Sequence, residues 1–252
     1  MKKFILSLAL LCGCVLGSQA QLLYKVSKDS SDVKPSYIVA SNRLINPMGT
    51  ITQVSELRNA MTYTDQMYFE VNKAAYANSL KDAKKLENGK TLLSLLTPAA
   101  LMEDLEQLLF VANHMGQYDP THTFDQYFEA QAKANNEMVG GLSEIDDYIN
   151  ATYKKDLKQQ VAQLVSFLEN ENVELSKLNK AVVAYGAQDL DAVGKASADR
   201  VDKALLAAWT AKMQTVMAEK PTFFVVDAAN LGGEEGILQQ LRQAGYTVEG
   251  LK

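Results

Sequence analysis

A short apolar run close to the C-terminal end limits the folds that this chain can adopt. Residues 222–226 read Thr-Phe-Phe-Val-Val, with four large apolar side chains in succession. Because neighbouring side chains of a strand point to opposite faces of the sheet, such a run predicts a strand whose sheet is covered on both faces. Residues 237–244 then repeat apolar side chains at helical spacing, Gly245 is placed to cap that helix, and residues 246–248 predict a last strand. The C-terminal end therefore predicts an α/β arrangement.

The N-terminal part also predicts strands. Residues 22–26 and 36–40 are apolar stretches separated by the polar turn 28–32, which is typical of a β-hairpin. A short helix is predicted over residues 54–61, and a third strand over residues 67–71.

The middle of the chain predicts helices. Apolar positions recur at helical spacing from Leu92, and Thr97 followed by Pro98 is a typical helix start. Similar patterns cover residues 124–134, 145–153, 157–168 and 201–217. Breaks are expected at Gly140, Gly141 and Gly186, and the charged residues 169–174 are expected to form a solvated loop or a helix end.

Together these patterns predict an α/β (α+β) fold in which a mixed sheet is formed by the two ends of the chain. We expect residues 21–252 to form a single domain, with a helical insertion over about 74–217.

The first twenty residues predict export. Two lysines precede the apolar run 4–11, which is shorter than a membrane-spanning helix and typical of a signal peptide. Small residues at positions 18 and 20 predict cleavage after Ala20, and therefore a periplasmic or secreted protein. The alternative is a lipoprotein acylated at Cys14, because residues 11–14 loosely resemble a lipobox. No later stretch is apolar enough to predict a transmembrane segment.

Composition narrows the possible chemistry. The chain has 252 residues, a formal net charge of -5, two cysteines and two histidines. Both cysteines lie in the predicted signal peptide, so a mature chain would have neither a disulfide nor a thiolate nucleophile. The acidic balance argues against nucleic acid as a partner.

Three separated blocks of sequence resemble one known family. They are residues 22–26 with 34–39, residues 125–142 around Asp-Gln-Tyr-Phe and Gly-Leu, and residues 224–248 around Asn-Leu-Gly-Gly-Glu-Glu-Gly. In order and spacing these blocks resemble the TraB/GumN family, which is related to the Tiki metal-dependent proteases. The resemblance implies an α/β core made from the two ends of the chain, which holds a helical middle. The middle block resembles the family's central helix and the strand that follows it, at Gly141-Leu142.

The resemblance also implies a metal site that this chain lacks. Active members carry a Gly-x-x-His motif in the first block and another in the last, and the paired imidazoles hold a divalent metal that activates water. Here the two motifs read Ala-Ser-Asn-Arg at 40–43 and Asp-Ala-Ala-Asn at 227–230. Both histidines are replaced, by Arg43 and Asn230.

Other positions differ from the family as well. Ser143 stands where the family usually has a glutamate, and Leu205-Leu206 stand where it usually has an Arg-Asn pair. Glu70 matches the family's acidic residue, but one glutamate is too few ligands for a catalytic metal.

A vestigial pocket is the candidate site. Its candidate residues are Asn42, Arg43, Glu70, Asp227, Asn230 and Glu234. The Arg43 guanidinium would oppose a divalent cation and could pair with Glu70 or Asp227 instead. Alternatively, Asn42 and Arg43 lie on a solvated loop, and Asn230 is an ordinary turn residue.

The two histidines form a weaker candidate metal site. His114 and His122 lie eight residues apart with Asp119 and Asp125 nearby, but without the helical i, i+4 spacing of a persuasive motif. We favour the interpretation that His114 ends a helix and His122 lies on a surface loop.

Three functional hypotheses follow. The first is an exported, catalytically inactive family member, a pseudoenzyme that needs no cofactor and binds an unknown protein or small ligand in the cell envelope. The second is a metal-dependent hydrolase or peptidase that holds a divalent metal through Glu70 with Asp227 or Glu234. The third is a helical interaction protein that uses residues 157–217.

Overall fold

The computed structural model describes residues 21–29, 32–43, 45, 47–51, 54–72, 123–144, 147–148, 165–166, 169–197 and 200–251. The predicted signal peptide, the predicted helix from Leu92, His114, His122 and most of residues 145–168 lie outside the described residues.

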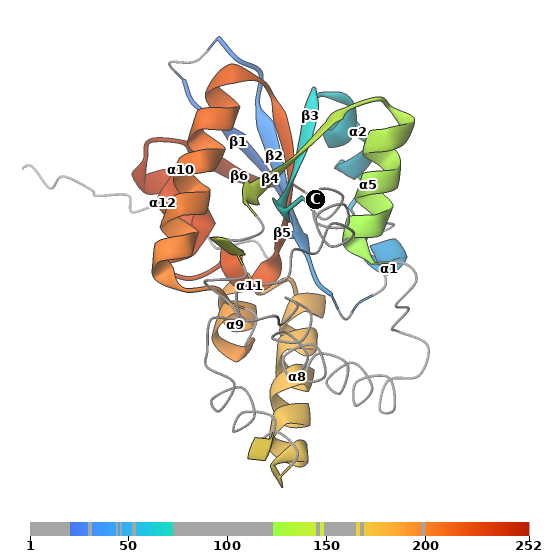
Figure 1. Ribbon diagram of the computed structural model, residues 1–252, viewed down its shortest axis with the longest axis vertical. Coiled ribbons are helices and arrows are strands. Elements are labelled where there is room, and N and C mark those ends of the chain that lie inside the picture. Colours follow the sequence, from blue (N-terminus) through green and yellow to red (C-terminus); the bar gives the residue numbers. More distant parts are fainter. Residues whose placement is uncertain are drawn as a thin grey trace, which may run out of the picture.

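Six strands form one mixed sheet in the order β4-β3-β5-β2-β1-β6. Their bounds are β1 Leu23–Ser27, β2 Ser36–Ser41, β3 Gln66–Val71, β4 Met138–Ser143, β5 Thr222–Asp227 and β6 Thr247–Leu251. β2, β5, β3 and β4 run parallel, whereas β1 is antiparallel to both β2 and β6. The predicted hairpin and the predicted α/β sheet are confirmed, with the two ends of the chain side by side in β2 and β5 (Figure 1).

Helices lie on both sides of this sheet (Figure 1). Their bounds are α1 Pro47–Ile51, α2 Leu57–Thr62, α5 Phe124–Ala134, α8 Glu171–Gly186, α9 Leu190–Ala196, α10 Lys203–Glu219, α11 Ala228–Leu231 and α12 Ile237–Gln243. In Figure 1, α10 and α12 lie on one side of the strands and α2 and α5 on the other, whereas α8, α9 and α11 lie beyond the end of β5. Among the described residues, no helix combines the length and apolarity needed to span a membrane.

The apolar run 222–226 is the centre of the core, as predicted. It forms β5, and its side chains are buried on both faces of the sheet. The ring of Phe223 lies 5.3 Å from that of Phe128 in α5, and the ring of Phe224 lies 6.0 Å from that of Tyr68 in β3. Consecutive β5 side chains therefore contact different neighbours, as strand alternation requires.

The prediction of chain breaks at Gly140 and Gly141 is wrong. Both glycines lie inside β4, so the middle of the chain is not entirely helical and contributes an edge strand to the sheet. A Cβ atom at Gly140 would lie 2.5 Å from ring carbons of Tyr68, and one at Gly141 would lie 2.7 Å from the backbone nitrogen of Asn72. These glycines are therefore needed for close approach of neighbouring groups, rather than for a turn.

Candidate functional site

Five of the six candidate residues, all except Glu234, lie at or just after the ends of the parallel strands. In the register of β2 and β5, Ser41 lies opposite Asp227, and in the register of β3 and β4, Val71 lies opposite Ser143. Because parallel strands share one carboxyl edge, the residues that follow them meet there. This is the edge at which α/β proteins usually bind ligands.

Glu70 connects two elements at this edge. Its Oε1 atom accepts a hydrogen bond of 3.0 Å from the backbone N–H of Asp227 and one of 2.8 Å from the side-chain amide of Asn230. Hydrogen bonds to a carboxylate are stronger than those between neutral groups. Glu70 in β3 thus fixes the end of β5 and the start of α11.

Asn230 is the most buried member of the cluster, with 1% of its surface exposed. Its Oδ1 atom accepts a hydrogen bond of 3.0 Å from the backbone N–H of Val201, and its Nδ2 atom donates to Glu70. Since one partner can only donate and the other only accept, the orientation of the amide is determined by its neighbours. The interpretation of Asn230 as an ordinary turn residue is therefore wrong.

Asp227 starts α11, a helix of four residues that periodicity could not predict. Its Oδ1 atom accepts a hydrogen bond of 2.8 Å from the backbone N–H of Ala229 and so caps the helix. This hydrogen bond stabilises the change of chain direction between β5 and α11.

Asn42 and Arg43 follow β2 at the same edge. Asn42 is buried, with 8% of its surface exposed, Arg43 is half-buried, and the Nη1 atom of Arg43 is shielded from solvent. The alternative of a fully solvated loop is therefore wrong. Nearby, the hydroxyl of Tyr185 in α8 donates a hydrogen bond of 2.9 Å to the carbonyl of Ala40. The last candidate, Glu234, is exposed on the turn between α11 and α12.

Ser143 and Trp209 meet at the end of β4. The indole N–H of Trp209 in α10 donates a hydrogen bond to the Ser143 hydroxyl. Trp209 is fully buried and stacks on Tyr148, with ring centroids 6.4 Å apart. The hydroxyl of Ser143 therefore satisfies a buried donor without introducing charge.

Several groups that sequence reasoning missed hold the loop formed by residues 227–236, which we call the closing loop. A side-chain nitrogen of Arg200 donates a hydrogen bond of 3.0 Å to the carbonyl of Gly232. The carboxylate of Asp191 accepts one of 2.6 Å from the backbone N–H of Gly233. Neither residue belongs to a recognisable motif, and their partners are backbone groups, so no pattern in the sequence signals these contacts.

Three side-chain oxygens at the carboxyl edge that could bind a divalent metal are engaged in hydrogen bonds inside the protein. Oε1 of Glu70, Oδ1 of Asn230 and Oδ1 of Asp227 each accept a hydrogen bond inside the protein. Arg43 follows β2 at the same edge, and its positive charge would disfavour a metal ion close to it. Within the described residues, no three His, Cys, Asp or Glu side chains are grouped so that they could hold a metal ion. The weaker candidate built on His114 and His122 lies outside these residues.

Comparison with known families agrees with this architecture. The model of the TraB/PrgY/gumN family matches residues 101–250, which is more than half of the chain and includes β4, α10 and the closing loop. The chain therefore belongs to the TraB/PrgY/gumN family. No curated protein and no solved structure matches the chain significantly.

Proposed function

We propose that this chain is an exported, non-catalytic member of its family, a pseudoenzyme in which the metal site has been replaced by internal hydrogen bonds. The observation that carries the proposal is the side chain of Asn230, which is held between Glu70 and the backbone of Val201. An imidazole at this position would be a metal ligand, whereas the amide cross-links three segments of the chain.

The chemistry supports this proposal. Metal-assisted hydrolysis needs a cation with several protein ligands and one open position for water. The cluster offers one shared carboxylate, a capping carboxylate and an arginine, and it lacks both motif histidines. Its role would then be to bind a protein or a small ligand in the cell envelope, without hydrolysis and without a cofactor.

The metal content of the purified protein tests the proposal. We expect less than a tenth of an equivalent of divalent metal after incubation with zinc, manganese or cobalt and dialysis. One equivalent of tightly held metal that is lost in Glu70→Gln would overturn the proposal and favour the hydrolase hypothesis. Glu56→Gln is the matched control, because Glu56 also accepts a hydrogen bond from an asparagine, Asn59, but on an exposed helix start.

The same measurement separates the possible ligand sets of the hydrolase hypothesis. If the metal were held by Glu70 and Glu234, the Glu234→Gln variant would lose it. If the metal were held by Glu70 and Asp227, or if none were bound, Glu234→Gln would leave the metal content unchanged. Asp227→Asn retains an oxygen that can cap Ala229, so it removes charge with little effect on the turn.

Export is tested by the mass of the protein recovered from a bacterial envelope fraction. We expect a mature chain that begins at Gln21, as cleavage after Ala20 predicts. A chain that begins at an acylated Cys14 would show a lipoprotein, and an uncleaved chain would contradict export.

A further inference from the structure

The closing loop is held by two described segments that lie close together in the sequence, through contacts that metal chemistry does not explain. We call these two segments the strap, which consists of residues 189–197 and 200–203 as the structure describes them. The strap contributes α9 and the start of α10, and α9 lies beside α11 at the carboxyl edge (Figure 1).

Polar contacts connect the strap to the closing loop along its length. Their pairs are Asp191 with Gly233 (2.6 Å), Arg200 with Gly232 (3.0 Å) and Ala229 (3.4 Å), Val201 with Asn230 (3.0 Å), and Lys203 with Glu235 (2.7 Å). In four of these five contacts the strap contributes a side chain. In the fifth it contributes the backbone N–H of Val201, whose partner Asn230 is buried.

Close backbone packing accompanies these contacts. A Cβ atom at Gly232 would lie 2.3 Å from the carbonyl oxygen of Leu190, and one at Gly194 would lie 3.1 Å from the carbonyl oxygen of Ala229. Gly233 has a φ of +83°, which a residue with a side chain rarely adopts. Gly232 and Gly233 of the closing loop therefore fit against the strap.

We propose that the strap and the closing loop form one cooperative latch, which closes the carboxyl edge of the sheet with the chain's own residues. Asn230 is its inner contact, because its two hydrogen bonds join the strap to Glu70 in the sheet. The Asp191–Gly233 hydrogen bond is its outer contact, on the exposed side. The strap opens as a unit, and its displacement exposes the carboxyl edge to a ligand or partner.

Cooperativity follows from how the contacts are arranged. The strap and the closing loop are about thirty residues or more apart in sequence, as shown by the separation of 29 residues between Val201 and Asn230. Once one contact has closed the intervening stretch of chain, forming the next contact costs less conformational entropy. Regions joined in this way open together as a local unfolding unit, at a free energy below that of global unfolding.

Hydrogen exchange of the full chain, read by mass spectrometry, tests the proposal. In Asn230→Ala we expect about a tenfold rise in exchange at Val201, as expected for loss of one hydrogen bond worth about 1.4 kcal/mol. A cooperative latch predicts a similar rise at Gly233, although the Asp191 contact is unchanged. A rise confined to Val201 would overturn the proposal.

The reciprocal variant removes the outer contact. Asp191→Ala should raise exchange at Val201 as well as at Gly233, and because Asp191 is exposed, this variant should fold even if Asn230→Ala does not. Unchanged exchange at Val201 would show that the contacts are independent. Exchange of the β1–β2 hairpin in each variant reports global unfolding and separates it from opening of the strap.

Two matched controls accompany these variants. Asn59→Ala removes an asparagine that also donates to a glutamate, but at the exposed start of a helix. Asp125→Ala removes an acidic residue from the first turn of α5, as Asp191→Ala does for α9. Neither control should change exchange in the strap, and this outcome is independent of whether the protein binds a metal.

Discussion

The two ends of the sheet use buried polar side chains in different ways. At the amino end, the backbone N–H of Thr222 donates to the hydroxyl of Ser36 (2.9 Å), and the amide of Gln66 donates to the hydroxyl of Thr222 (2.8 Å). All three residues are buried, and Thr222 is completely so. This network is neutral and ties β2, β5 and β3 together at strand positions that the register already fixes.

At the carboxyl end, the network is charged and extends beyond the sheet. Glu70 joins β3 to the end of β5 and to Asn230 in α11, and Asn230 continues the connection to the strap. The neutral network thus stabilises elements that would be adjacent without it. The charged network instead holds irregular backbone in place at the end of β5 and beyond it.

The largest expected difference between the two ends is the effect of removing Glu70. Glu70→Ala leaves the N–H of Asp227 and the amide of Asn230 without this acceptor. With about 1–3 kcal/mol for each lost acceptor, we expect the free energy of unfolding to fall by about 3 kcal/mol. Urea unfolding followed by Trp209 fluorescence measures it. Glu56→Ala is the control, and an equal loss there would mean that the carboxyl-end network contributes nothing of its own.

A buried tyrosine gives the next largest effect and depends on pH. Burial raises the pKa of Tyr24 to about 12 from 10.0, and its hydroxyl donates to the carbonyl of Gln21. The folded state therefore holds the proton more tightly, so this contribution is complete below pH 10 and is lost as the pH rises from 10 to 12. The two-unit shift corresponds to a loss of about 2–3 kcal/mol.

Urea unfolding at several alkaline pH values measures this loss. Tyr24→Phe should make the pH dependence between 10 and 12 shallower. The pKa values of Tyr37, Tyr68 and Tyr246 are also raised by burial, so some dependence should remain in the variant. An unchanged slope in Tyr24→Phe would contradict the assignment to Tyr24 and leave the other tyrosines as its source.

The amino-end network should contribute less than the carboxyl-end one. Thr222→Val keeps the shape and the β-branching but leaves the amide of Gln66 without its acceptor, which should cost about 1–2 kcal/mol. Thr215→Val is the matched control, because Thr215 lies on an exposed helical face and its hydroxyl bonds only to its own helix. A cost above that of Glu70→Ala would reverse the ranking of the two ends.

The sequence predicted the elements whose signals are local. The bounds of α5 and the position of β5 follow from periodicity and an apolar run, and the capping box of Thr123 and Gln126 begins α5 where the pattern does. The residue pattern missed β4, because its two glycines suit a close approach to Tyr68 and Asn72, which is a tertiary contact. The family resemblance did imply a strand at Gly141-Leu142, and β4 confirms it. The short helices α9 and α11 offer too few turns for a periodic pattern.

The candidate site was also predictable only in part, because its residues have recognisable positions in the sequence but their contacts are tertiary. Glu70 and Asn230 were located through the resemblance, which assigned them to one pocket, and they are in contact. The role of Asn230 was not predictable, because its partners Val201 and Glu70 are 29 and 160 residues away and one of them is a backbone group. A sequence shows which side chain is present, but not which distant N–H it will satisfy.

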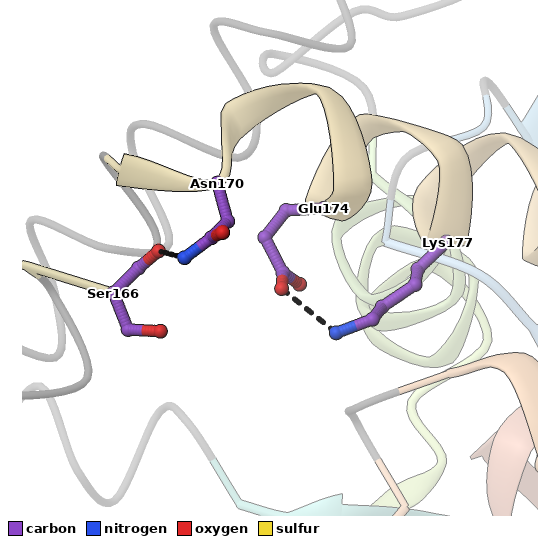
Figure 2. A network of polar contacts seen from close by, with 4 residues as sticks. All are labelled: Ser166, Asn170, Glu174 and Lys177. Atoms are coloured by element: carbon purple, nitrogen blue, oxygen red, sulfur yellow. Dashed lines mark hydrogen bonds and ion pairs between the residues drawn. The ribbon is translucent and has the colours of Figure 1, made fainter.

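The smallest expected effect concerns two ion pairs at the protein surface. Figure 2 shows Glu174 and Lys177 paired on α8 beside the hydrogen bond from Asn170 to Ser166, and Lys203 pairs in the same way with Glu235 on the closing loop. Each pair has a distance of 2.7 Å. A direct comparison between a pair within one helix and a pair that crosses from the strap to the closing loop is therefore possible.

The hydrogen bond between Lys203 and Glu235 raises the pKa of the lysine and lowers that of the glutamate. The pair therefore favours folding only between these two pKa values, and its contribution is lost as pH falls through that of Glu235 or rises through that of Lys203. Because both side chains are solvated, water and salt screen the attraction, and Lys203→Ala should not shift the urea midpoint measurably at 0.5 M salt, as expected for a Debye length of about 4 Å. Lys177→Ala should behave alike. If Lys203→Ala lowers the urea midpoint and Lys177→Ala does not, the Lys203–Glu235 contact contributes more to stability than an ordinary exposed ion pair. The difference between the neutral amino end and the charged carboxyl end of the sheet would then include this surface contact.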